Sequence, residues 1–135
     1  MKGTRLVLAA VVSLVATVVP VFAHHSFTAE FDIDKPVTLK GTVKQFDFVN
    51  PHGWLYVDVK GDDGKIVTWA IETGGPGALL RRGVRKDSFP IGVEVTVKGY
   101  RAKSDLPKAN GSSVKTADGR DYFLASSGPG GEGTN

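Results

Sequence analysis

The chain has 135 residues, with 17 lysines and arginines, 14 aspartates and glutamates, three histidines and no cysteine. This length fits one small domain, and the lack of cysteine excludes a disulfide framework, so stability has to come from core packing. Two of the basic residues, Lys2 and Arg5, lie at the start of the chain. The nearly neutral remainder excludes the clustered basic field that a nucleic-acid-binding protein needs.

Residues 1–23 have the features of a secretory signal peptide. Lys2 and Arg5 precede an almost unbroken apolar run at residues 6–19, and small residues follow Pro20 up to Ala23. This order predicts cleavage after Ala23 and a periplasmic or secreted protein, with no membrane span left in the mature chain. An uncleaved anchor is the alternative, because the apolar run approaches the roughly 20 residues that cross a bilayer.

The first strand is expected to be long and bent. An acidic, irregular N-terminal segment, residues 24–36, precedes it. Residues 37–43 alternate apolar and polar side chains with a period of two, which predicts a strand with one buried face. The phase of this alternation changes at residues 44–45, before Phe46 and Phe48. A bulge at that point keeps both sets of side chains pointing inward.

Two further strands and a short helix follow. Residues 54–60 and 65–72 are rich in β-branched and aromatic side chains, and the Gly-Asp-Asp-Gly of residues 61–64 predicts a hairpin turn between them. Residues 78–82 favour a helix of about two turns. Gly83 is expected to end this helix.

The last third of the chain predicts a strand and then a hairpin. Residues 93–99 alternate cleanly and predict the fourth strand. A polar loop is expected around residues 107–111, and residues 114–117 and 121–124 predict a final hairpin. Residues 126–135 are rich in glycine and serine with almost no apolar side chain, which predicts a disordered tail.

Together these elements predict an all-β domain, residues 37–125, with one short helix. Three strands, a helix and then the remaining strands is the element order of a small OB-like barrel of five to six strands. In such a barrel, a long first strand pairs with both halves of the sheet. An open sandwich of six short strands is the alternative architecture.

The three histidines are the strongest candidates for a functional site. Cleavage after Ala23 makes His24 the first residue, so that its free amino group and its ring nitrogen can chelate one metal ion. His25 and His52 supply further imidazoles if the N-terminal segment folds back along the barrel. Nitrogen ligands of this kind suit copper(II) first, and zinc or nickel less strongly.

A role without metal is the alternative for these histidines. His24 and His25 would then be solvated terminal residues, and the ring of His52 would bond to a backbone carbonyl in its turn. Glu72, at the end of the third strand, is the carboxylate expected nearest to the barrel mouth. It would ligate the metal or orient a ligating histidine, although a lone glutamate at a strand end is often solvated.

Aromatic side chains are concentrated on the first three strands. Phe48, Trp54, Tyr56 and Trp69 are candidates for a surface that stacks on a ligand, as one face of OB folds stacks on bases or sugar rings. For an exported protein, a saccharide suits this surface better than a nucleic acid. Burial is the alternative, because most aromatic residues on strands pack in the core.

No catalytic constellation is recognisable in the sequence. We find no nucleophile with a base at a familiar spacing, no glycine-rich phosphate loop and no paired carboxylates suited to acid and base roles. The sequence therefore gives no support for an enzyme, and no catalytic residue is assigned.

Several spaced blocks of residues carry a family resemblance. They include His-His-Ser-Phe at residues 24–27, Asn-Pro-His at residues 50–52 and Asp-Gly-Arg at residues 118–120. Taken together, these blocks resemble a family of small exported bacterial proteins catalogued as domain of unknown function 6152. The resemblance covers His24 to about Leu124 and implies a small exported β-barrel, in which the His-His start and the Asn-Pro-His turn occur together. It implies no established activity.

The chain departs from the family pattern at two aromatic positions. It has Phe48 where family members usually carry tryptophan, and Val84 where they often carry an aromatic residue. These departures weaken the aromatic-surface hypothesis and leave the histidines intact. The sequence therefore predicts an exported protein that binds a transition metal through His24, His25 and His52. The alternative is a non-catalytic binding module for a saccharide, an envelope component or a protein partner.

Overall fold

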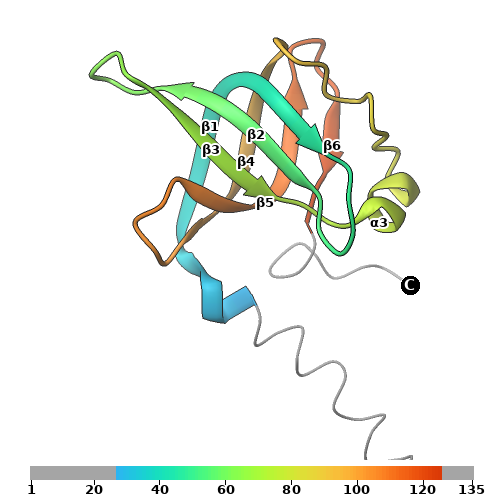
Figure 1. The fold of residues 1–135 in the computed structure, drawn as a ribbon, viewed down its shortest axis with the longest axis horizontal. Helices are drawn as coiled ribbons and strands as arrows, with labels where there is room; N and C mark the ends of the chain where they lie inside the picture. The colour runs from blue at the N-terminus through green and yellow to red at the C-terminus, as the bar shows by residue number, and fades with distance from the viewer. Residues whose placement is uncertain (1–26, 126–135) are drawn as a thin grey trace, which may run out of the picture.

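The computed structural model describes residues 27–125, and their secondary structure is mostly β. A helical turn at residues 27–30 leads into the first strand, and one short helix interrupts the series of strands (Figure 1). The elements are β1 (Phe31–Asp47), β2 (Trp54–Lys60), β3 (Ile66–Glu72), α3 (Pro76–Arg81), β4 (Glu94–Ala102), β5 (Lys108–Thr116) and β6 (Asp121–Phe123). The predicted fold class, mainly β with a short helix after the third strand, is confirmed.

The strands form one sheet that closes into a ring (Figure 1). Their order is β3-β2-β1-β4-β5-β6, and neighbours in this order are antiparallel. In addition, the end of β3 pairs in parallel with the start of β5, through residues 70–72 and 108–110. This parallel pairing closes the circuit β1-β2-β3-β5-β4, as expected for an OB-like arrangement.

β1 joins the two halves of the ring. It pairs with β4 from Phe31 to Thr42 and with β2 from Thr42 to Asp47. The register with β2 shifts between Val43 and Gln45, where the hydrophobic alternation of the sequence changes phase. The predicted long, bent first strand with a bulge at this point is therefore confirmed. A bulge increases the local twist of a strand, which helps β1 to turn from one half of the sheet to the other.

Two segments differ from the prediction. β1 begins at Phe31, so part of the segment 24–36, where the sequence predicts irregular structure, is strand; Phe31 pairs with Ala102 and its side chain is buried. Residues 107–111, where the sequence predicts a polar loop, lie mostly within β5. The start of β5 lies between β3 and β4 and pairs with both. Backbone pairing on two sides therefore outweighs the weak strand preference of its small and polar side chains.

α3 covers one end of the ring. It begins at Pro76, whose fixed backbone angle suits the first turn of a helix, and its Leu79 is fully buried in the core. The chain then reverses at Gly83, which has a φ of +79°. This positive φ explains why glycine ends the helix, as predicted.

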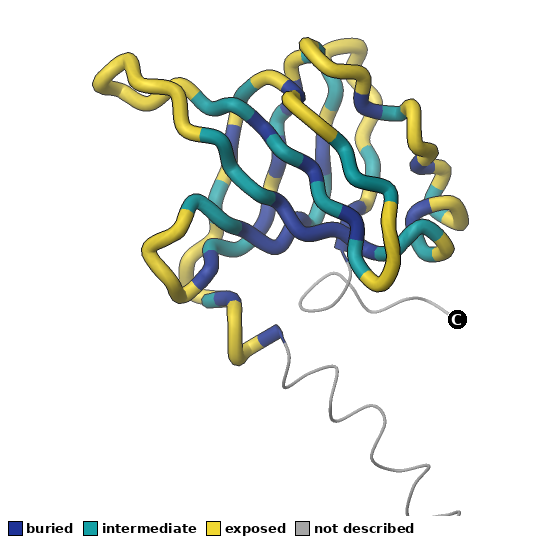
Figure 2. Tube along the Cα trace, viewed as in Figure 1, coloured by how far each residue is buried: buried dark blue, intermediate teal, exposed yellow. Residues whose placement is uncertain are grey.

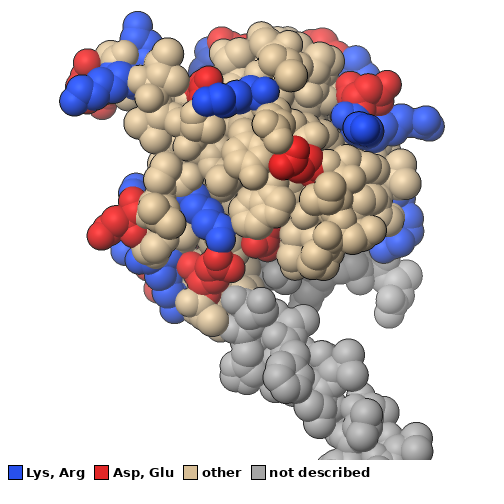
Figure 3. Space-filling model, viewed as in Figure 1, with Lys and Arg blue, Asp and Glu red and all other residues tan. Residues whose placement is uncertain are grey.

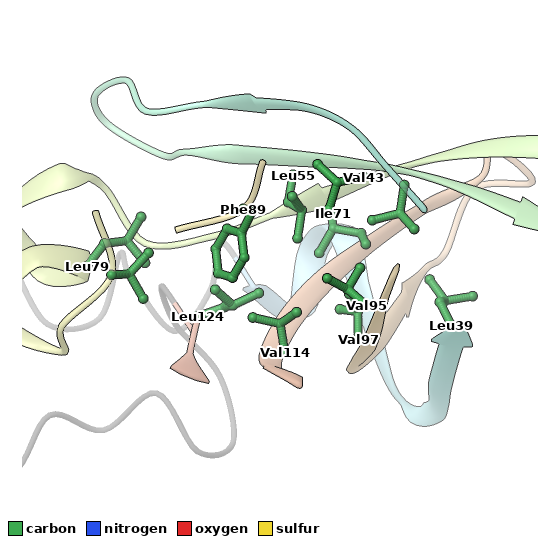
Figure 4. Close-up of a cluster of buried hydrophobic side chains, with 12 residues drawn as sticks. Leu39, Val43, Leu55, Ile71, Leu79, Phe89, Val95, Val97, Val114 and Leu124 are labelled. Atoms are coloured by element: carbon green, nitrogen blue, oxygen red, sulfur yellow. The ribbon is translucent and has the colours of Figure 1, made fainter. Parts of the chain in front are cut away.

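The hydrophobic core fills the ring (Figure 4). Alternate residues of each strand point inward, whereas the turns are mostly exposed (Figure 2). Side chains from α3 and from the connection to β4 close one end of the core. Its buried residues are Leu39, Val43, Leu55, Val57, Ile71, Leu79, Val84, Phe89, Val95, Val97, Val114 and Leu124.

A second, smaller cluster attaches the start of the described chain to the outside of the ring. Phe27 and Phe31 pack with Ala102, and Tyr100 packs against this group. The ring of Phe27 lies 5.9 Å from that of Tyr100 in an edge-to-face arrangement and 5.7 Å from that of Phe31. The helical turn at residues 27–30 is therefore docked on β4.

Candidate functional site

The loop between β1 and β2 carries His52 and is held against the segment that follows β3. The amide of Gly53 donates to the carbonyl of Gly74 at 3.2 Å, and the amide of Thr73 donates to the carbonyl of Gly53 at 2.9 Å. A Cβ atom on Gly75 would lie 2.5 Å from the carbonyl oxygen of Pro51. The two backbones therefore approach as closely as glycine allows, and this contact sets the position of His52.

His52 lies beside Glu72. Its Nδ1 atom is 3.8 Å from Oε1 of Glu72, and 42% of its side chain is exposed. Nδ1 itself is buried and has no hydrogen-bond partner within residues 27–125. A buried polar atom left without a partner costs about 1–3 kcal/mol. The ring nitrogen that faces Glu72 therefore has a lone pair or a proton available for another group.

Glu72 ends β3 and is buried, with 7% of its surface exposed. Nδ2 of Asn110 donates a hydrogen bond to Oε1 of Glu72 at 3.3 Å, and Asn110 is only 1% exposed. The parallel pairing of β3 with β5 places these two residues directly opposite each other. Sequence reasoning missed Asn110, because a single polar residue between Ala109 and Gly111 gives no periodic signal.

Four strands contribute to one row of residues on the outer face of the ring. Residues directly opposite each other on paired strands point to the same face. Tyr100 of β4 pairs with Asn110, Asn110 with Glu72, and Glu72 with Trp54 of β2. Strands lie about 4.8 Å apart, so roughly 10 Å separates the positions of Tyr100 and Glu72. The row connects the docking place of Phe27, on Tyr100, with His52.

The predicted N-terminal ligands, His24 and His25, lie outside the described residues, as does the predicted signal peptide. Within residues 27–125, no group of three or more histidine, cysteine, aspartate or glutamate side chains is placed to hold a metal ion. His52 and Glu72 bring together two donors, an imidazole nitrogen and a carboxylate oxygen. A complete metal site needs further ligands.

The predicted stacking residues fall on different faces of the sheet. Trp54 and Tyr56 lie on the outer face of β2, whose centre is largely uncharged when seen from this side (Figure 3). Trp69 lies opposite the fully buried Val57 and therefore on the inner face. Phe48 packs edge-to-face on Phe46, against the core. The structure therefore separates these four side chains, and they do not form a single flat surface.

A polar cavity of about 530 Å³ lies away from His52. It is formed by the connection between α3 and β4 and by the β5–β6 hairpin. Its charged side chains are Arg85, Asp87, Asp118 and Arg120. Asp118 and Arg120 form an ion pair with each other, at 2.6 Å, and both are at least half exposed. This cavity presents balanced charges rather than a set of metal ligands.

Comparisons with known proteins identify a family but no individual related protein. No curated protein and no solved structure matches the chain. Of the helices in the described part, none has the length and apolar character needed to cross a bilayer. Residues 10–112 match the Family of unknown function (DUF6152), which confirms the resemblance seen in the residue blocks. Because this match covers most of the sequence, the chain belongs to the DUF6152 family.

Proposed function

We propose that the protein is exported, to the periplasm or outside the cell, and binds a transition metal ion through His52 together with His24 and His25. The observation that carries this proposal is the buried Nδ1 of His52, which has no hydrogen-bond partner in the described part of the chain and lies 3.8 Å from the carboxylate of Glu72. A histidine with a purely structural role normally satisfies a buried ring nitrogen with a hydrogen bond. A metal ligand needs that nitrogen to be free.

The spacing of the two donors fits one metal ion. Bonds from a metal to histidine nitrogen and to carboxylate oxygen are each about 2.0–2.2 Å long. An ion between Nδ1 of His52 and Oε1 of Glu72 can therefore bridge the 3.8 Å that separates them. The hydrogen bond from Asn110 holds this carboxylate in place, which is the usual role of groups that support a metal ligand.

The N-terminal histidines are within reach of this place. Phe27 is docked on Tyr100, and His25 and His24 precede Phe27 by two and three residues. An extended chain covers at most about 3.3–3.6 Å per residue, so these residues can extend roughly 7–11 Å from Phe27. The upper end of this range, which applies to His24, matches the roughly 10 Å between the positions of Tyr100 and Glu72 along the row.

Copper is the metal that this ligand set favours. Cleavage after Ala23 would give His24 a free amino group next to its imidazole, so that one residue supplies two nitrogen donors. Copper(II) binds nitrogen ligands more tightly than the other divalent metals of the first row. Zinc and nickel are the next candidates.

Titration of copper(II) into protein that begins at His24 tests the proposal. We expect the electron paramagnetic resonance spectrum to show nitrogen ligation, and the H52A variant to bind copper at least about tenfold more weakly. The N50A variant changes an exposed residue of the same loop and serves as the control. One extra residue before His24 should also weaken binding, because it removes the chelating amine. Equal copper binding by H52A and the unmodified protein would exclude the site. Separately, mass spectrometry of the exported protein would identify its first residue and so test whether His24 has a free amino group.

The alternative function, a non-catalytic binding module, is favoured by an apolar groove at the opposite end of β3. The groove measures about 300 Å³ and includes Val67, Trp69 and Pro107, with the guanidinium of Arg101 5.3 Å from the centre of the Trp69 ring. Such a surface suits the apolar face of a sugar or a protein partner. In the W54F variant, Trp69 is the only fluorescent tryptophan. Oligosaccharides or envelope components that bind here should change its emission, and an unchanged spectrum would count against this function.

A further inference from the structure

We propose that Lys108 is a positioning residue, which clasps the N-terminal segment to the outer face of the ring beside His52 and Glu72. This inference rests on the proposed metal function and extends it. The metal site needs ligands from two parts of the chain that are far apart in sequence. A contact that holds these parts together should therefore control how well the site assembles.

Lys108 touches both parts at once. Its ammonium group forms an ion pair with the carboxylate of Glu30, in the helical turn that precedes β1. The same ammonium lies 5.7 Å from the centre of the Phe31 ring and 5.0 Å from the centre of the Trp54 ring. Both distances are within the range of a cation–π interaction. One side chain of β5 thus links the start of the described chain to β2, at the residue that pairs with Glu72.

A second lysine fixes the backbone of the same turn. The amide of Lys103 donates to the carbonyl of Glu30 at 2.9 Å, and its ammonium donates to the carbonyl of Thr28 at 2.5 Å. Lys103 and Lys108 lie on either side of the connection between β4 and β5. Lys103 therefore binds the backbone of the helical turn, and Lys108 binds Glu30, the only acidic side chain of that turn.

The contacts of Lys108 with Glu30, Phe31 and Trp54 form a clasp. The position of Lys108 on β5 places this clasp close to the metal donors. Lys108 and Asn110 are two residues apart on one strand, so their side chains point to the same face at a spacing of about 7 Å. Asn110 holds the carboxylate of Glu72. A single stretch of β5 thus positions the carboxylate and the N-terminal segment together. Holding a ligand-bearing segment near its site raises its effective concentration there.

The test compares copper binding by K108M with that of the unmodified protein, both beginning at His24. We expect the K108M variant to bind copper(II) about tenfold more weakly, with an altered paramagnetic spectrum, because the N-terminal ligands are released. K108R keeps the charge and should restore affinity and spectrum. K115M removes an exposed lysine from the far end of β5 and should behave like the unmodified protein. The E30Q variant breaks the ion pair from the other side without changing β5, so it decides the question if K108M folds poorly.

Hydrogen exchange provides a readout that does not depend on metal. Residues 27–31 should exchange faster in metal-free K108M, and K108R should restore their protection. Faster exchange combined with unchanged copper affinity and an unchanged spectrum would show that the clasp is merely structural, and would overturn the inference. The H52A variant separates the two proposals. If H52A also binds copper normally, the metal site itself is wrong, whereas a loss confined to H52A leaves the metal site standing and rejects the clasp.

Discussion

At the β5–β6 hairpin, Thr116 and Arg120 lower the pKa of Asp118, which lies between them in the sequence. The hydroxyl of Thr116 and the guanidinium of Arg120 donate hydrogen bonds to the carboxylate of Asp118, as does the backbone amide of Arg120. These contacts lower the pKa of Asp118 from 3.8 to about 2, although half of its side chain is exposed. Hydrogen bonds to the charged form of an acid, rather than burial, are the cause.

The lowered pKa of Asp118 predicts a pH dependence of stability. The pKa is about 2 in the folded protein and about 3.9 in an unfolded chain. The stabilisation from the ionised group is therefore complete above about pH 4 and is lost as the pH falls toward 2. In urea unfolding, the difference in stability between the unmodified protein and D118N should shrink over this pH range. The T116V variant, which removes one donor, should raise the pKa of Asp118 in an NMR titration. A value near 3.8 in the unmodified protein would contradict this account.

At the scale of single elements, Gly41 shows what β1 needs in order to pair on both of its edges. A Cβ atom at this position would lie 2.3 Å from the carbonyl oxygen of Asp58 and 2.8 Å from Cγ1 of Val57, both on β2. On the other edge, Gly41 pairs with Val95 of β4. The crossing of these strands therefore leaves no room for a side chain at this point.

The G41A variant should be clearly destabilised. Its methyl group must displace the backbone of β2, which costs at least as much as an overpacked core, about 1–3 kcal/mol in the free energy of unfolding. The G77A variant is the matched control. Gly77 lies in α3 and a Cβ there meets only the end of Arg81, at 3.8 Å. Alanine should stabilise this helix by up to about 0.5–1 kcal/mol. Equal stabilities of the two variants in chemical denaturation would show that the strand crossing is looser than we describe.

At the scale of the whole molecule, the parallel pairing of β3 with β5 closes the ring and creates the candidate site. It joins Ile71 to Ala109 and Glu72 to Asn110. Ile71 points inward and is fully buried, whereas Glu72 points to the outer face, beside His52. Ring closure therefore combines core packing with placement of the polar site.

The I71A variant tests the contribution of this closure. Truncating a fully buried isoleucine leaves a cavity and should lower the free energy of unfolding by about 2–5 kcal/mol. The I91A variant makes the same chemical change at a residue that is 77% exposed, and should alter the stability by less than about 0.5 kcal/mol. Thermal or denaturant unfolding measures both. A small effect of I71A would mean that the ring stays intact without this contact.

Local patterns in the sequence were sufficient for most of the fold. A period of two in the hydrophobic side chains predicted β4 and most of β1, and the phase change before Phe46 predicted the bulge. The β-branched and aromatic residues of β2 and β3 predicted those two strands. Glycine and aspartate identified the turns, because Gly64 and Gly119 adopt the positive φ angles of 80° and 87° that other residues avoid. These features depend on neighbouring residues only, so a single sequence contains enough information to predict them.

Tertiary structure decided what no local pattern encodes. The start of β5 is a strand because β3 and β4 pair with it from both sides, although its residues resemble a loop. The same closure brings Asn110 to Glu72, and the loop after β1 brings His52 to the same carboxylate. The sequence identified His52 and Glu72 as candidates from their residue types, but their contact joins segments that are distant along the chain. Such contacts form only when the ring closes, because the free energy that stabilises them comes from the core as a whole.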